Sequence, residues 1–116
     1  MKINVTKEAQ AKLQKYVDAG KKLLLDLDDG FGKYSDEGTC ALLTKFRIIA
    51  VDDDELKDYP IQLDSAVGKI YFKDSARSFF DDGMTLKVNP KTDLLIFSNT
   101  KEIIDGNINI IDNIKN

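Results

Sequence analysis

The chain's single cysteine, Cys40, is its strongest candidate for metal binding or covalent chemistry. It follows three glycines, Gly30, Gly32 and Gly38, in the stretch DDGFGKYSDEGTC, which lies between two apolar runs. A thiolate can bind a metal or attack an electrophile, whereas an unpaired cysteine in apolar surroundings behaves as a small hydrophobe. The residue type alone leaves both interpretations open.

The chain contains no histidine, and this limits what Cys40 can do. A Cys-His or Ser-His nucleophile is excluded, and the commonest neutral metal ligand is missing. The neighbouring Asp36 and Glu37 would disfavour a thiolate if they lie close to it, because like charges repel. We therefore expect no enzymatic activity.

Other motifs near Cys40 have simpler explanations. The glycines lack the Lys-Ser/Thr ending of a Walker loop and the helix that opens a dinucleotide site, so we expect a connecting loop. The acidic run at residues 52–55 lacks the spacing of an EF-hand and predicts a solvated turn. Acids near Cys40 could bind loose iron through oxygen, although we expect them to be solvated: Asp28, Asp29, Asp36 and Glu37.

Composition indicates one globular domain over residues 1–116. The chain has 42% apolar and 32% charged residues, an ordinary balance for a protein that buries a core. Its net charge is −3 and it has no Lys/Arg block, so we do not expect it to bind nucleic acid.

The location predicted from the sequence is cytoplasmic. The first ten residues lack the apolar stretch of a secretory signal. The longest uncharged apolar run, Ile48 to Val51, is too short to span a bilayer. A single cysteine makes no intramolecular disulfide, which agrees with a reducing compartment.

The N-terminal third predicts one helix and two strands. Thr6 is a candidate helix cap and Gly20 a stop, with apolar residues on one helical face between them. Residues 22–29 alternate as a half-buried strand, and residues 41–51 predict a longer strand with both faces partly covered.

The remainder predicts short strands and turns. Residues 61–63 and 70–72 alternate, and residues 84–88 and 93–99 form a hairpin across a four-residue turn. The C-terminal part predicts a helical turn at 100–104, a tight turn at 105–106 and a strand at 108–111.

One further helical turn and a set of aromatic core residues are expected. Ser75 is a candidate cap for this short helical turn. Four phenylalanines in alternating or capped segments are expected in the core: Phe46, Phe72, Phe79 and Phe80. The fold class is therefore α+β and mostly β, with short, largely antiparallel strands, an N-terminal helix and short helical turns.

Several segments resemble the HesB/IscA-like iron-sulfur biosynthesis domain, most closely its small Firmicutes-type branch. They are IYFKDSARSFFDDGMTLKV at residues 70–88 and SNTKEIIDGNINI at residues 98–110. The opening VTKEAQAKL and the strand KLLLDLDD also follow the family order, so the resemblance covers nearly the whole chain.

The resemblance implies a HesB-like fold and a role as scaffold or carrier for iron-sulfur clusters. Such proteins bind clusters through one cysteine in a Gly-rich loop and a Cys-Gly-Cys near the C-terminus. Here EGTCA at residues 37–41 matches the loop, so Cys40 inherits the metal and cofactor ligand role, while the tail NINIIDNIKN has no cysteine.

A cluster needs about four thiolate-type ligands, so even a homodimer with two cysteines would be incomplete. The expected function is therefore related to iron-sulfur cluster biosynthesis, with iron or a cluster completed by an external thiol or a partner. The implied partners are assembly or recipient proteins and a second copy of the chain. The alternative is a degenerate interaction module that kept the fold and lost the metal.

Overall fold

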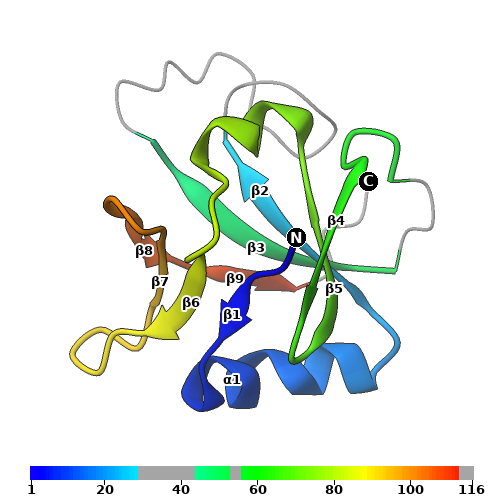
Figure 1. Cartoon of the computed structure of the whole chain (residues 1–116). Coiled ribbons are helices and arrows are strands. Elements are labelled where there is room, and N and C mark those ends of the chain that lie inside the picture. The colour runs from blue at the N-terminus through cyan, green and yellow to red at the C-terminus, as the bar shows by residue number, and fades with distance from the viewer. Residues whose placement is uncertain (29–43, 53–55, 113–116) are drawn as a thin grey trace.

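The computed structural model describes residues 1–28, 44–52 and 56–112, which form two β-sheets with a helix along one side (Figure 1). The larger sheet has the strand order β4-β5-β2-β3-β9, with bounds Ile61–Ser65, Gly68–Phe72, Lys22–Leu27, Phe46–Val51 and Ile110–Asp112. The smaller sheet has the order β1-β6-β7-β8, with bounds Asn4–Val5, Thr85–Val88, Leu95–Ser98 and Ile103–Ile108.

Helix α1, Lys7–Asp18, is the element whose limits follow most directly from local signals. The Thr6 side chain accepts a hydrogen bond from the Ala9 amide at 3.3 Å, which satisfies one free donor of the first turn. After the helix, Gly20 adopts φ +84°, a conformation that a glycine adopts without strain. Ala9 and Leu13 are fully buried, so the predicted helix and its apolar face are confirmed.

Strand β2 lies in the middle of the larger sheet, and it is buried on both faces. Leu23 and Leu25 enter the main core, whereas Leu24 packs with Ile49 and Val51 in a second cluster. The prediction of a half-buried strand is wrong here, because Tyr59 and its neighbours cover the face that was expected to meet water.

Aromatic rings join the two sheets and the short 3-10 helix η1, Asp74–Phe79. The Phe97 ring of β7 lies 5.1 Å from the Phe46 ring of β3 and 6.2 Å from the Phe72 ring of β5. Phe79 and Phe80 add edge contacts to Phe46 and Phe72, at 5.7 and 5.1 Å. The core prediction is confirmed for Phe46 and Phe72, which are buried, whereas Phe79 and Phe80 are partly buried and pack against the core.

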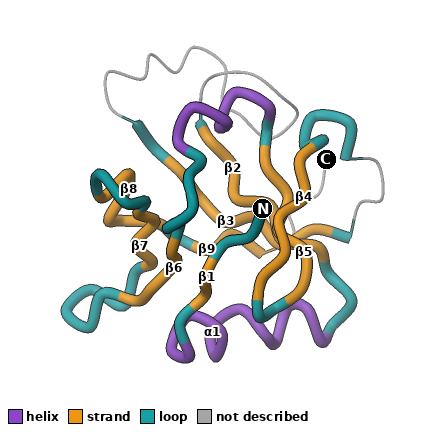
Figure 2. The backbone as a smooth tube through the Cα atoms, viewed as in Figure 1, coloured by secondary structure: helices purple, strands orange, loops and turns teal. Residues whose placement is uncertain are grey.

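Pairing is largely antiparallel, as predicted, with parallel pairs that the sequence pattern did not indicate. Among the described strands, four pairs are antiparallel and three are parallel: β1 with β6, β2 with β5 and β3 with β9. In each parallel pair the two strands are far apart in sequence, with other strands between them in chain order, and Figure 2 shows these strands distributed over the two sheets.

Four local predictions differ from the structure. The expected helical turn at 100–104 and tight turn at 105–106 overlap β8, which pairs with β7 through a register shift. The expected last strand at 108–111 is divided between the end of β8 and β9. Helix η1 begins after Lys73, which occupies the N-cap position in place of Ser75 and has no side-chain capping bond.

Candidate functional site

Cys40 lies outside the described residues, and so do Asp29, Asp36 and Glu37. The structure does describe the two strands between which this stretch of sequence runs. It follows β2 and precedes β3, and these strands are antiparallel neighbours with Leu27 opposite Phe46. The end of β2 and the start of β3 therefore lie side by side at the same end of the sheet (Figure 1).

Hydrogen bonds hold these two strand ends together. The Asp28 amide donates to the Lys45 carbonyl at 2.8 Å, which extends the ladder by one step. The Phe46 amide donates to a carboxylate oxygen of Asp105 at 2.8 Å. Because Asp105 belongs to β8, the smaller sheet anchors the start of β3.

A buried charge cluster lies immediately beside these ends. The Asp26 carboxylate is fully buried in β2. It accepts the Arg47 Nε donor at 2.8 Å and the Tyr59 hydroxyl at 2.6 Å, and the Lys73 Nζ lies 3.1 Å away. We call Asp26, Arg47, Tyr59 and Lys73 the Asp26 cluster.

Lys73 links the Asp26 cluster to the last carbonyl of β2. Its side chain is 6% exposed, and Nζ donates to the Leu27 carbonyl at 2.9 Å while it contacts Asp26. Since Lys73 also precedes η1, one ammonium group ties the start of this helix to the end of β2. The cluster therefore fixes the strand end at which the Cys40 stretch begins.

Burying charges is costly unless they are paired, so this cluster acts as a unit. Burial, followed by the charge of Asp26 and the hydrogen bond to it, raises the pKa of the Tyr59 hydroxyl above its ordinary value of 10.0. Tyr59 is thus held as a neutral donor to Asp26. These side chains are occupied with one another, which indicates support for a site and not reaction with a ligand.

Asp28 differs from the expectation of a solvated acid. It is half-buried, and its Oδ1 atom is buried with no hydrogen-bond partner in the described part of the chain. Desolvating a carboxylate oxygen without a partner is unfavourable, so Asp28, the one of the four predicted acids within the described residues, lies in an unusual environment.

Residues 1–28, 44–52 and 56–112 contain no group of three or more His, Cys, Asp or Glu side chains that could hold a metal ion. The part of the chain that the structure describes thus offers no complete metal shell. The predicted ligand role of Cys40 therefore remains a prediction from the sequence.

The sequence analysis did not identify the Asp26 cluster. Asp26 and Arg47 are directly opposite in the β2–β3 register, yet 21 residues separate them in sequence. The only local signal for the cluster was a charged residue, Asp26, within the run of leucines in β2. Its partners come from three other segments, so no local pattern indicates them.

We predict that replacing Asp26 by Asn destabilises the fold by about 3 to 5 kcal/mol, because Arg47 and Lys73 lose a buried counter-charge. Urea unfolding of the purified variant measures this. Asp64→Asn is the matched control, because it removes an exposed carboxylate that pairs with Lys69 at the surface and should change stability little. Equal small effects for both variants would contradict the prediction.

We predict that Tyr59 makes the fold less stable at high pH. The unfolded state releases the hydroxyl proton near pH 10 and the folded state at a higher pH, so the unfolding free energy falls as pH rises above about 10. Urea unfolding of the wild type and Tyr59→Phe between about pH 8 and about pH 11 isolates this contribution. Lysine titration is common to both proteins and does not distinguish them. If the unfolding free energy falls with pH equally steeply in both, Tyr59 is not the group responsible.

Comparison with known proteins identifies the family. The family model described as iron-sulphur cluster biosynthesis matches residues 1–112. None of the curated proteins matches the chain. Within the part of the chain that the structure describes, no helix has the length and apolarity to span a membrane.

Two solved structures are similar along nearly the whole chain. A Lactobacillus salivarius protein assigned to Fe-S biosynthesis is 39% identical, with a TM-score of 0.82 over 97% of this chain and 98% of that one. A Lactobacillus acidophilus protein with the same assignment is 29% identical, with a TM-score of 0.73 over 97% and 90% of the two chains. The predicted fold and resemblance are confirmed, and the chain belongs to the iron-sulphur cluster biosynthesis family.

Proposed function

We propose that this protein is a non-enzymatic carrier or scaffold in iron-sulfur cluster biosynthesis, and that Cys40 supplies its one thiolate ligand. The observation that carries the proposal is the family match over residues 1–112, a range that includes Cys40. Cys40 also stands in the sequence between two strands whose ends are fixed by the Asp26 cluster and Asp105.

The chain's own side chains do not complete a cluster shell. Iron-sulfur clusters take about four thiolate-type ligands, with histidine replacing two in some proteins. One chain has one cysteine and no histidine, and a homodimer would have two cysteines. The cluster or iron is therefore cargo, held jointly by Cys40 and by thiols from a small molecule or a partner protein.

This shared coordination defines the partners of the proposed function. An assembly protein that donates a cluster and a recipient that accepts it would each bring further thiolates. Transfer then proceeds by ligand exchange, in which a thiolate of the recipient replaces the Cys40 thiolate on the same iron. The proposal places the protein in the cytoplasm, where a reducing environment keeps a single thiol available.

A second function is favoured by the same ligand count. With one cysteine and no histidine, the chain suits an interaction module that kept the fold of the family without its metal. This hypothesis expects a folded, metal-free protein whose stability and partner binding do not depend on Cys40.

We predict that anaerobic reconstitution with ferrous iron, sulfide and dithiothreitol gives visible charge-transfer absorption and bound iron, because dithiothreitol supplies the missing thiolates. Cys40→Ser should lose both signals. Gel filtration before the iron assay removes unbound iron sulfide, and urea unfolding checks that the variant is folded.

The controls separate the two functions. Absorption retained in folded Cys40→Ser would contradict Cys40 as the ligand. Absorption absent from the wild type, with and without added thiol, would reject the carrier role and favour the metal-free module.

A further inference from the structure

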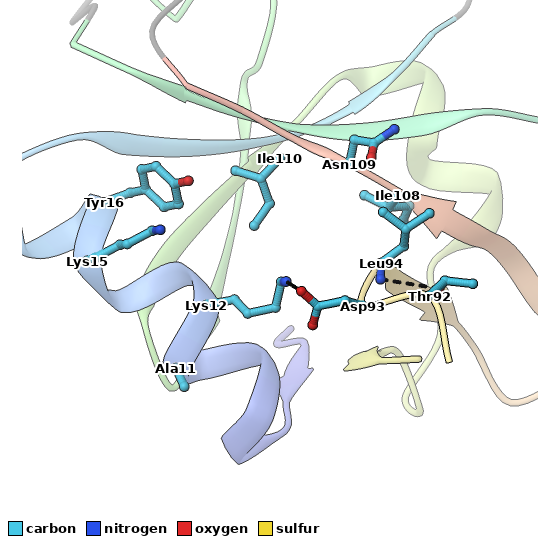
Figure 3. A pocket seen from close by; sticks show the side chains of 10 residues that line it. All are labelled: Ala11, Lys12, Lys15, Tyr16, Thr92, Asp93, Leu94, Ile108, Asn109 and Ile110. Carbon is cyan, nitrogen blue, oxygen red and sulfur yellow. Dashed lines mark hydrogen bonds and ion pairs between the residues drawn. The ribbon is translucent and has the colours of Figure 1, made fainter. Parts of the chain in front are cut away.

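A groove of about 520 Å³ lies between α1, the turn before β7 and the junction of β8 with β9 (Figure 3). Its volume falls within the range of about 300 to 1,000 Å³ that ligand-binding pockets occupy. One side is apolar, lined by the partly buried Leu94 and Ile110, with Ile108, 1% exposed, beneath them. The α1 side is basic, and Figure 3 shows Lys12 and Lys15 directed from the helix toward the groove.

The groove holds one carboxylate for two ammonium groups. Lys12 Nζ lies 2.8 Å from an Asp93 carboxylate oxygen, an ion pair that crosses from α1 to the turn before β7. Lys15 Nζ lies 5.1 Å from the centre of the Tyr16 ring. No carboxylate in the described part of the chain pairs with Lys15, so the groove has an unneutralised positive charge in a chain of net charge −3.

We propose that this groove docks a segment of a partner protein that carries a carboxylate side chain next to an apolar one. The carboxylate would contact Lys15, and the apolar side chain would pack on Leu94 and Ile110. The same face already binds a carboxylate of the chain itself, because Asp93 forms an ion pair with Lys12.

The exposure of the groove favours a protein segment over a free organic acid. Lys15 is exposed, and the Asp93 side chain is 82% exposed, so a lone carboxylate would gain little from either lysine in water. A protein segment adds apolar burial in the same event, and the two contributions together give affinity.

The groove is separate from the strand ends that flank the Cys40 stretch. In Figure 1, α1 lies at the bottom of the molecule, whereas the end of β2 and the start of β3 lie near the top. The inference does not rest on the proposed carrier function, since docking is tested with metal-free protein and leaves Cys40 unchanged.

The experiment selects peptides from a random phage-displayed library on immobilised metal-free protein, then measures the enriched peptides by fluorescence anisotropy. We expect enriched sequences with Asp or Glu beside an apolar residue. Their affinity should fall about fivefold in Lys15→Gln and at least about tenfold in Lys15→Glu. Lys7→Gln is the matched control, because Lys7 is exposed on α1 and does not line the groove.

A double-mutant cycle sharpens the result. Exchanging the peptide's acid for its amide should weaken binding to the wild type and have little further effect on Lys15→Gln. No enrichment, equal binding to Lys15→Glu, or equal losses in Lys7→Gln would overturn the proposal. Hexanoate serves as the free-acid probe. If hexanoate displaces the peptides at concentrations close to the dissociation constants of the peptides themselves, the site binds small acids and the proposal is overturned.

Discussion

The buried carboxylate of Asp26 is the constraint on which the arrangement around β2 depends. It lies in the central strand of the larger sheet, where a lone charge would be strongly unfavourable, and it is compensated by Arg47, Lys73 and Tyr59. These partners come from β3, the start of η1 and the segment before β4. One pairing requirement therefore brings four segments together at the strand end where the Cys40 stretch begins.

Local signals were sufficient for the elements that depend on near neighbours. Helix α1 was predictable because Thr6 and Gly20 set its limits within the same short stretch, and the β6–β7 hairpin because its turn residues adjoin its strands. Strand β8 was missed because the turn-like residues Asp105 and Gly106 are held in a strand by pairing with β7, with a register shift that no local pattern indicates.

The candidate site was predictable only in part, and for a similar reason. Cys40 was chosen by its residue type and by resemblance to a family; the family match covers its position but does not test its role as a ligand. The Asp26 cluster was not found, because Lys73 reaches the Leu27 carbonyl across 46 residues of sequence. Long-range electrostatic compensation leaves little trace in a single sequence, whereas the aromatic core followed from apolar alternation.

Structural support, cargo binding and partner contacts belong to three different parts of the chain. The Asp26 cluster stabilises the strand ends, Cys40 is the proposed ligand, and the groove beside α1 is the proposed docking surface. Iron and acid-labile sulfide analysis of the protein purified without oxygen from its producing cells tests the central claim of cargo binding most directly. The account predicts iron and sulfide that co-purify with the wild type and not with Cys40→Ser, whereas equal iron in both proteins, or none in either, would contradict it.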